Sequence, residues 1–404
     1  MKDFTFTEIN QPQKGDTVLV GMSGGVDSTL VSLLLKEQGC KVIGVTMSTW
    51  DNDLPIEPSP DGLRHSCYGP DEKIDIETCK KFCAENDIEY HVISVKDEYK
   101  KNVLEYFKAE YRNGRTPNPC IMCNPTVKFG ALLQGAEKLG IKFDYFCTGH
   151  YAKLVKCNSP INEILKTEAG EENSTTSSEV NQFPIFISQA EDGTKDQAYF
   201  LNRIKSEVLE KVRFPLSKMT KKEVYEEARK RNLQAAEKSE SQDFVPPEIF
   251  EKIFADVKSI PGNIIDENGK VLGKHRGIEF YTIGQRRGLG VSAKNPLYVK
   301  EINKENNTVV LSENDGLLAQ GLIATNWVWA GNFAPEKPFY ALVKIRLASK
   351  PVEALIEKSK EDYPEGSYKI TFTEKQRAIA PGQSAVVYIN GITIGGGVIE
   401  KAFS

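Results

Sequence analysis

A short apolar run that passes through a glycine-rich loop into a helical pattern constrains the fold of this chain most strongly. Residues 17–22 are apolar and β-branched, residues 23–28 read SGGVDS, and residues 29–38 carry leucine and valine at helical spacing. Gly39 follows, as glycines do just past the end of a helix. Because a second apolar run covers residues 42–47, the strand–helix–strand order predicts a parallel sheet with a right-handed crossover.

The loop at residues 23–28 has the features of a phosphate site. Adjacent glycines let backbone N–H groups approach an anion, the helix N-terminus adds positive potential, and Ser23 and Ser28 supply hydroxyl donors. The loop lacks the Gly-Lys-Ser/Thr of a Walker A motif, so it better suits an ATP cleaved between its α- and β-phosphates, as in adenylation. An ordinary strand–turn–helix connection is the alternative. In a parallel sheet we expect the nucleotide over the C-terminal ends of the strands.

The N-terminal half continues the alternation of strands and helices. We expect helices over residues 74–86 and 98–112 and strands over residues 90–95 and 145–148. The loop at residues 51–65 leaves the second strand, so this loop and Cys67 at its close should lie near the nucleotide edge. Cys79 and Cys83 stand at i and i+4 of a helix, which is compatible with one face packing inward, and we expect them to be core or surface residues rather than ligands.

Composition excludes several classes of protein. The 404 residues carry a net charge of −4 with a pI near 5.8, which argues against a globally basic nucleic-acid binder but leaves a local basic face open. No signal-peptide pattern opens the sequence and no apolar run approaches the ~20 residues that span a bilayer, so we expect a cytoplasmic protein without a membrane segment. In a reducing compartment, the eight cysteines should be ligands, reactive groups or, as for Cys40 and Cys147, buried apolar residues.

Changes in composition along the chain predict three domains. Residues 158–183 are rich in Ser, Thr, Glu and Asn, which predicts a mobile insertion. From residue 262, short β-rich runs alternate with turns, and the glycines at 395–397 fit tight β packing or a bulge better than a phosphate loop. We expect an α/β, parallel-sheet, ATP-binding catalytic domain over residues 1–204, a small central helical and β domain over 205–295, and a C-terminal β-barrel over 296–404.

Cys120 and Cys123 form a CxxC pair, and no cysteine follows Cys157. The spacing holds two thiols within about one turn of each other, which suits redox exchange, zinc or an iron–sulfur cluster alike. The surrounding sequence has to decide among these chemistries.

An ordered set of segments resembles the MnmA/TrmU family of tRNA 2-thiouridylases, which are PP-loop ATPases. The segments are residues 23–28, 114–119 (GRTPNP), Cys123-Asn124 with Lys128-Phe129, 148–151 (TGHY), 195–197 (KDQ), 284–290 (GQRRGLG) and 381–384 (PGQS). The resemblance implies adenylation of the wobble uridine at O2 and replacement of AMP by sulfur. It also implies Mg²⁺ with the ATP, tRNAs for Lys, Glu and Gln as substrates, a tRNA-binding central domain, and a sulfur donor protein or sulfide.

The site residues of this family carry over to matching positions. The implied ATP contacts are Gly21, Met22, Ser23, Gly24, Gly25, Val26, Asp27, Ser28, Met47 and Gly149. The implied tRNA contacts are Asn118, Pro119 and Cys120 at the target base, together with Lys195, Asp196, Gln197, Arg346 and Leu347. For Lys195 and Arg346 a solvated surface charge is the alternative. Gln285, Arg286 and Arg287 either bind phosphate or only shape a turn.

The sequence departs from the family pattern at three places. Leu347 stands where an aromatic residue is common, which weakens a stacking role there. Cys120 stands where aspartate is common, so no general base is assigned, while Cys123 matches the nucleophile. The second catalytic cysteine of the family follows Glu-Ser-Gln, but residues 239–245 read SESQDFV and contain no thiol. The usual persulfide and disulfide mechanism therefore cannot run unchanged.

Two repairs of the sulfur chemistry are compatible with these residues. In one, Cys120 replaces the missing cysteine, so that one thiol of the pair carries persulfide sulfur and its neighbour releases the product. In the other, which we favour, Cys120, Cys123 and a third ligand hold a 4Fe-4S cluster that carries a sulfide, as the resemblance to cluster-dependent tRNA thiolases, related PP-loop enzymes with a CxxC pair and one distant cysteine, implies. Cys67 is the preferred third ligand, with an ordinary loop thiol as the other interpretation of this residue, and Asp243 is the alternative ligand. A zinc site is the competing hypothesis for the CxxC pair. A tRNA-binding paralogue without activity is the competing hypothesis for the whole chain, although the intact ATP loop and the gained Cys120 disfavour it.

Overall fold

The structure is a computed structural model that describes residues 4–52, 54–58, 67–176, 178–237, 244, 247–256, 258–359 and 363–404. The chain divides into two compact units, each built from segments that are distant in sequence. The first comprises Met1–Val103, Cys120–Asn158 and Phe183–Ala255, and the second comprises Leu104–Pro119, Ser159–Gln182 and Asp256–Ser404. The domain limits expected after residues 204 and 295 stay predictions. No helix in the described ranges is long and apolar enough to cross a membrane.

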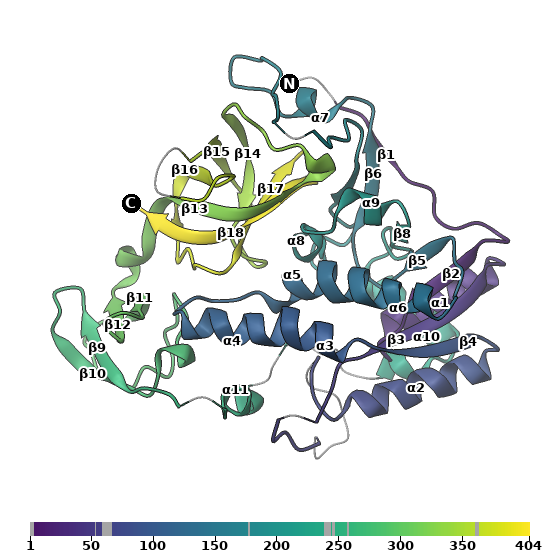
Figure 1. The fold of residues 1–404 in the computed structure, drawn as a ribbon, viewed down its shortest axis with the longest axis horizontal. Helices are drawn as coiled ribbons and strands as arrows, with labels where there is room; N and C mark the ends of the chain where they lie inside the picture. The colour runs from purple at the N-terminus through teal and green to yellow at the C-terminus, as the bar shows by residue number, and fades with distance from the viewer. Residues whose placement is uncertain are drawn as a thin grey trace. The chain divides into compact units, whose positions relative to one another are not determined.

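A five-stranded parallel sheet forms the centre of the first unit (Figure 1). Its strands lie in the order β4 (Glu89–Ser94), β3 (Lys41–Ser48), β2 (Thr17–Gly21), β5 (Tyr145–Cys147) and β8 (Val212–Arg213). Each neighbouring pair is parallel, which confirms the predicted α/β class. The chain runs from β2 outward to β3 and β4 and returns on the other side of β2 as β5. In such sheets, ligands bind at the carboxyl edge where the strand order reverses, which here is the end of β2.

Helix α1 (Val26–Glu37) follows β2 and ends where a glycine permits the turn. Gly39 has a φ of +92°, its N–H donates to the Lys36 carbonyl oxygen at 2.9 Å, and the Cys40 N–H donates to the Leu35 carbonyl oxygen at 3.0 Å. These two bonds are those of a Schellman C-cap, in which a left-handed residue closes the last turn. The helix end predicted from Gly39 is confirmed.

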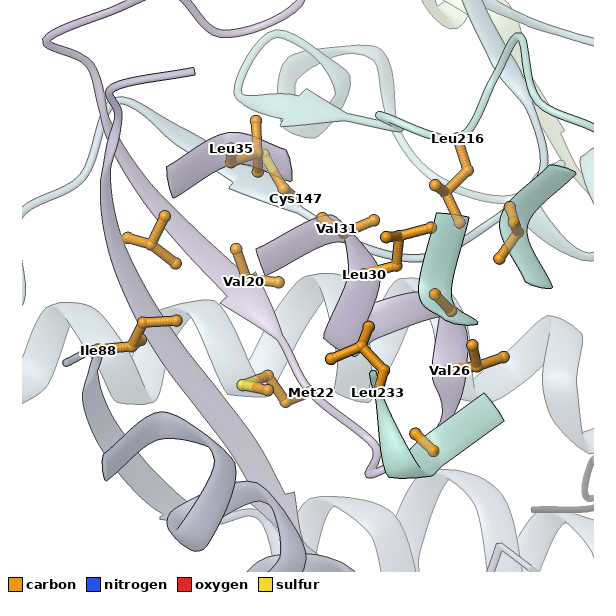
Figure 2. Close-up of a cluster of buried hydrophobic side chains, with 14 of the residues drawn as sticks. Val20, Met22, Val26, Leu30, Val31, Leu35, Ile88, Cys147, Leu216 and Leu233 are labelled. Carbon is orange, nitrogen blue, oxygen red and sulfur yellow. The ribbon is translucent and has the colours of Figure 1, made fainter. Parts of the chain in front are cut away.

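A hydrophobic core joins β2 and α1 to helix α10 (Lys221–Lys230). Leu30 and Val31 of α1 are fully buried, and Figure 2 shows both beside Val20 of β2. Val224 and Ala228 of α10 belong to the same cluster. Cys40 and Cys147 are buried in this core, as predicted, and Cys79 and Cys83, expected in the core or at the surface, are buried in it too.

Shorter elements complete the first unit. They are the helices α2 (Glu72–Glu85), α3 (Lys96–Tyr99), α5 (Pro119–Cys123), η2 (Asn124–Ala131), α6 (Leu132–Lys138), α8 (Ala198–Leu201), α9 (Ser206–Leu209), η3 (Gln234–Glu237) and α11 (Pro247–Ile253), and the antiparallel strands β1 (Phe6–Glu8), β6 (Lys153–Cys157) and β7 (Ile185–Ser188). Helix η2 is a π-helix, and so is η1 (Lys100–Leu104), which continues α3 into α4 (Glu105–Arg112) of the second unit. The expected helices and strands at residues 74–112 and 145–148 are therefore confirmed to within a few residues.

The second unit contains two β structures. A four-stranded sheet has the order β10 (Val271–His275), β9 (Gly262–Asp266), β12 (Thr308–Ser312) and β11 (Tyr298–Asn303). Its core includes Ile264, Val299 and Val309, all with no solvent exposure. The short helices of this unit are α7 (Ile161–Ile164), η4 (Ile278–Phe280), η5 (Asn314–Leu317) and η6 (Ala330–Asn332).

The other β structure is a closed antiparallel barrel. Its strands are β13 (Leu318–Trp329), β14 (Phe339–Lys344), β15 (Val352–Lys358), β16 (Tyr368–Arg377), β17 (Ser384–Ile389) and β18 (Ile392–Phe403). Pairing runs from β13 through β16, β15, β14, β17 and β18 back to β13, so the predicted C-terminal barrel is confirmed. A Cβ on Gly395 would lie 2.6 Å from the Trp329 ring, and one on Gly397 would lie 2.4 Å from the Trp327 ring. These glycines serve tight β packing, as predicted.

The segment expected to be a mobile insertion contacts the barrel loops of its own unit. Asn173 donates from Nδ2 to the Lys337 carbonyl oxygen at 2.9 Å, and its Oδ1 accepts the N–H of Glu336 at 2.9 Å. The Glu336 N–H also donates to the Ser174 carbonyl oxygen at 3.1 Å. The mobility of this segment stays a prediction.

Candidate active site

The glycine-rich loop between β2 and α1 is closed by its own serines. Ser28 accepts the N–H of Ser23 at Oγ over 3.2 Å and donates to the Gly25 carbonyl oxygen, also at 3.2 Å. Gly24 has a φ of +75°, which side-chain-bearing residues rarely adopt, and a Cβ there would lie 3.0 Å from Asp75 Oδ1. Gly24 and both serines are therefore needed for this loop conformation, and the loop has the compact form that a phosphate cradle requires.

The predicted ATP contacts come together at the carboxyl ends of three adjacent strands. Met22 follows β2 and donates its N–H to the Val45 carbonyl oxygen of β3 at 2.8 Å, and Met47 lies near the end of β3. Gly149 follows β5, and a Cβ there would lie 2.7 Å from Asp27 Cβ and 3.0 Å from Ser28 N. Only a glycine allows β5 to approach the first turn of α1 this closely. Their role as ATP contacts stays a prediction.

Lys221, at the start of α10, reaches the same first turn of α1, and sequence reasoning missed it. Its Nζ donates to both carboxylate oxygens of Asp27 at 2.8 Å, and Tyr151 donates its hydroxyl to Asp27 Oδ1 at 2.8 Å. Lys221 is only 9% exposed. Thr220 and Glu223 form a capping box that fixes the start of this helix. The lysine stands in an ordinary helix pattern, so no sequence signal pointed to it.

A second missed residue holds the chain just beyond β3. Glu72, at the start of α2, is 4% exposed, and its carboxylate accepts from Ser48 Oγ, Thr49 N, Thr49 Oγ1 and Trp50 N at 2.7, 2.6, 2.6 and 3.1 Å. Four donors compensate for taking one carboxylate out of water. Glu72 thereby fixes the segment that follows the strand carrying Met47.

The CxxC pair lies on α5, and both side chains keep partial solvent exposure. Desolvation by the surrounding protein raises the pKa of Cys120 to about 12 and the pKa of Cys123 to about 11. The charge of Lys128 opposes this shift in the pKa of both thiols, and Cys67 adds to it. Lys128 and Cys67 therefore act in opposite directions on the ionisation of the pair.

The π-helical geometry of η2 helps to place Lys128 near the pair. Pro125 lacks an N–H, and the following turn uses the i to i+5 spacing of a π-helix. Lys128 is five residues beyond Cys123, so this spacing brings it roughly one turn along on the same side. In a regular α-helix, five residues would turn the side chain about 140° away. π-Helical turns are rare in proteins, and those that occur are often found at functional sites.

Lys128 also acts on the end of β5. His150 is half-buried between Phe129 and Phe214, with ring centroids 5.7 and 5.9 Å away, and its Nδ1 lies 2.7 Å from Thr148 Oγ1. Burial, and after it the charge of Lys128, holds the pKa of His150 well below its ordinary value, so the imidazole is neutral at neutral pH. The thiol pair and the β5 edge are therefore both within the influence of one ammonium group.

The metal-ligand set remains a prediction. Among the residues that the structure describes, no group of three or more His, Cys, Asp or Glu side chains is arranged to hold a metal ion. Cys67 is exposed, and it is among the described residues in which no such group is found. Asp243, the alternative third ligand, lies outside the described residues, as do residues 238–242 and 245–246.

The loop expected to meet the target base belongs to the second unit, where the PGQS segment holds it. Gln383 donates from Nε2 to the carbonyl oxygens of Thr116 and Pro117 at 3.1 Å each, and the Thr116 N–H donates to the Pro381 carbonyl oxygen at 2.7 Å. Arg115 pairs with Glu110 and Glu400, both at 2.8 Å. Asn118 and Pro119 follow directly on this clamped stretch, and their contact with the base stays a prediction.

The other predicted tRNA contacts have mixed local roles. Asp196 accepts the N–H of Ala190 at 3.0 Å, and Gln197 accepts the N–H of Tyr151 at 2.9 Å, so both fasten their own loop while Lys195 stays half-exposed. In the second unit, Arg346 is half-exposed and Leu347 is 40% exposed. Gln285 accepts the Thr282 N–H at 3.0 Å and donates to the Arg287 carbonyl oxygen at 2.9 Å, which favours turn shaping for that residue.

Comparison with known proteins gives full-length similarity to one family. Residues 16–246, 252–313 and 319–399 match, in turn, the families described as tRNA methyl transferase HUP domain, tRNA methyl transferase PRC-barrel domain and aminomethyltransferase beta-barrel domain. The chain is 40% identical over 384 residues to the tRNA-specific 2-thiouridylase MnmA of Endomicrobium trichonymphae, covering 95% of this chain and 98% of the relative. It is 38% identical over 391 residues to the MnmA of Carboxydothermus hydrogenoformans, with 95% and 97% covered.

Solved structures are more distant. The U34-tRNA thiolase NcsA from Methanococcus maripaludis with its [4Fe-4S] cluster aligns at a TM-score of 0.33 and 19% identity, covering 61% of this chain and 66% of that chain. Similarity at this level supports no statement about chemistry. Both full-length relatives are tRNA-specific 2-thiouridylases. This chain therefore belongs to the MnmA family of tRNA-specific 2-thiouridylases and is a tRNA sulfurtransferase.

Proposed function

We propose that this sulfurtransferase adenylates the wobble uridine of its tRNA with ATP and then replaces the AMP by sulfur at the CxxC pair. One observation supports the proposal: Phe129 of η2, the helix that follows the CxxC pair, lies 5.7 Å from the ring of His150, and the neighbouring Gly149 packs against the phosphate loop. Gly149 packs against the first turn of α1, the next residue His150 feels the charge of Lys128, and Lys128 acts on both thiols. A base held beside these residues can reach an α-phosphate on one side and a sulfur atom on the other.

In the first step, the loop between β2 and α1 binds the phosphates of ATP, accompanied by Mg²⁺. The uridine O2 attacks the α-phosphorus, the N3 proton is lost to solvent, and pyrophosphate leaves with the electron pair of the broken P–O bond. Backbone N–H groups of Gly24 and Gly25 and the N-terminus of α1 stabilise the negative charge of the phosphates. Met47 at the end of β3 supports the adenine.

In the second step, a sulfur nucleophile attacks C2 of the adenylated uridine, the C2–O2 bond breaks, and O2 departs on AMP. In the cluster hypothesis Cys120 and Cys123 would hold a 4Fe-4S cluster with Cys67 as third ligand, although the three described thiols are not arranged to hold a metal ion in this structure. Such a cluster, when bound, supplies the sulfide. Direct persulfide transfer between Cys120 and Cys123 is the second candidate, favoured by their one-turn spacing on α5.

The substrate side of the proposal rests on the two units separately. In the second unit, Asn118 and Pro119 end a clamped loop and would meet the base, and Arg346 and Leu347 offer partly exposed side chains to RNA. In the first unit, Lys195 offers a half-exposed charge for a phosphate. tRNAs for Lys, Glu and Gln are the proposed substrates, and a donor protein or free sulfide would supply the sulfur.

Iron dependence separates the two sulfur mechanisms. Protein reconstituted anaerobically with iron and sulfide is incubated with ATP, sulfide and unmodified tRNA, and 2-thiouridine is counted by nucleoside mass spectrometry. The cluster mechanism predicts thiolation only after reconstitution, with about four irons and four sulfides per chain, and loss of both in Cys67→Ala. Cys40→Ala is the matched control, since Cys40 is buried in the core of the first unit.

Thiolation at full rate in iron-free protein would contradict the cluster mechanism and favour the persulfide mechanism. A full cluster in Cys67→Ala would remove Cys67 as the third ligand. No 2-thiouridine with any tRNA or sulfur supply would contradict the proposed function itself.

A further inference from the structure

The phosphate loop carries no lysine of its own, although phosphate-cleaving loops of the Walker A type use one on the terminal phosphates. We propose that Lys221, supplied by the distant helix α10, takes this role and binds the pyrophosphate that leaves during adenylation. The inference deepens the proposed function and rests on ATP binding at residues 21–28.

The geometry puts the Lys221 ammonium at the phosphate loop. Its Nζ lies 2.8 Å from both carboxylate oxygens of Asp27, and Asp27 is the second residue of α1, directly beside Gly25 and Ser28 in the loop fold. The Nζ also lies 5.6 Å from the ring centroid of Tyr151, whose hydroxyl donates to the same carboxylate. A ligand phosphate in the loop would therefore sit within reach of a lysine on a flexible four-carbon stem.

The position of the lysine is fixed by bonds that do not involve its charge. Thr220 caps α10 and accepts the Glu223 N–H, while the Lys221 N–H donates to Asp192 Oδ2 at 2.9 Å. Val224 and Ala228 already join α10 to α1 through the hydrophobic core. Pairing of the two helices thus has an apolar basis, and a mostly buried ion pair adds a desolvation cost that packing alone would avoid.

A role in catalysis gives a reason for this buried charge. In adenylation the α-phosphorus bond to the bridging oxygen breaks, and the electron pair leaves on pyrophosphate. A cation that is already held in place stabilises this charge without reorganisation at the moment of reaction. Without ATP, the Asp27 carboxylate neutralises the Lys221 ammonium. The phosphates of bound ATP would give the ammonium a second anionic partner.

The test compares product inhibition by pyrophosphate and by AMP in Lys221→Met, with Lys222→Met as the matched control. Lys222 is the next residue of the same helix, and its side chain is 86% exposed. Loss of one charged hydrogen-bond donor should raise the inhibition constant of pyrophosphate by about 10-fold to 100-fold. The AMP inhibition constant should stay within about twofold. Lys222→Met should match wild type for both ligands, and Lys221→Arg should recover most of the loss.

A second measurement needs no variant and covers the case in which Lys221→Met fails to fold. Lysines of the wild-type protein are reductively methylated with Mg²⁺ and pyrophosphate, with AMP alone, or with neither, and modified sites are counted by mass spectrometry. Pyrophosphate should reduce labelling of Lys221 several-fold and leave Lys222 unchanged, whereas AMP should change neither.

An unchanged pyrophosphate constant in folded Lys221→Met, or equal labelling of Lys221 with and without pyrophosphate, would overturn the inference. If wild-type protein with tRNA releases no pyrophosphate from ATP, it is the proposed function that fails, and this outcome is seen before any variant is compared.

Discussion

Replacing Gln383 with methionine should slow thiolation by loosening the loop that leads to Asn118 and the CxxC pair. The Gln383 amide donates two hydrogen bonds, to the carbonyl oxygens of Thr116 and Pro117, at 3.1 Å each. Methionine has a similar length and no donor, so it removes both bonds with little change in packing volume. The neighbouring Gly382, with a φ of +91°, keeps the turn in place in both proteins.

The size of the effect follows from the two bonds. A neutral hydrogen bond contributes about 0.5–1.5 kcal/mol net, so the pair contributes about 1–3 kcal/mol. If this free energy selects the productive loop conformer, kcat/KM for tRNA falls by about 5-fold to 150-fold, at 1.36 kcal/mol for each factor of ten. A melting temperature lowered by about 2–10 °C is expected as well.

The assay is thiolation of unmodified tRNA under single turnover, with ATP and tRNA varied in separate series. We expect the loss in the dependence on tRNA, while the KM for ATP stays near wild type. Gln376→Met is the control, because Gln376 donates only to the nearby Glu374 carbonyl oxygen, at 2.8 Å on the surface. A lower melting temperature with unchanged kcat/KM for tRNA would refute the positioning role and leave Gln383 as a fold-stabilising residue only.

Two further predictions concern the first unit. Gly149→Ala should raise the KM for ATP at least ~10-fold, because the new methyl group would lie 2.7 Å from Asp27 Cβ. Gly193→Ala is the control and should leave the KM for ATP unchanged, because no atom lies within 4 Å of a Cβ there. Equal kinetics of the two variants would contradict this prediction. Glu72→Gln should lower the free energy of unfolding, measured in urea, by about 2–4 kcal/mol, because the amide NH₂ of glutamine would face hydrogen-bond donors that it cannot accept from. Glu77→Gln, at an exposed position of the same helix, is the control. A loss below ~0.5 kcal/mol in Glu72→Gln would show that the four hydrogen bonds contribute little to stability.

Features set by neighbouring residues could be predicted from the sequence. The strand, the glycine loop and the helix closed by Gly39 depend on contacts within a few positions, and the structure reproduces them. The glycines at 395–397 were predictable for the same reason, since a glycine run inside a strand pattern indicates a close approach. Only the structure shows that two tryptophan rings make this approach.

Features that join distant segments could not be predicted. Lys221 meets Asp27 across 194 positions, and nothing in its helix pattern distinguishes it from the solvated lysine next to it. Glu72 begins an ordinary helix, yet it accepts four hydrogen bonds from residues at and just beyond the end of β3. The π-helical spacing that brings Lys128 toward Cys123 likewise has no reliable local signature beyond Pro125.

The most direct test of the central claim is a single-turnover experiment with Cys123→Ser, ATP labelled at the α-phosphate and labelled sulfide. Adenylation at the phosphate loop does not need the thiol, whereas sulfur insertion does. We expect Cys123→Ser to accumulate tRNA carrying labelled AMP and to form no 2-thiouridine, while wild-type protein forms 2-thiouridine and releases AMP. Formation of 2-thiouridine at the wild-type rate in Cys123→Ser, or no adenylated tRNA in either protein, would contradict this expectation.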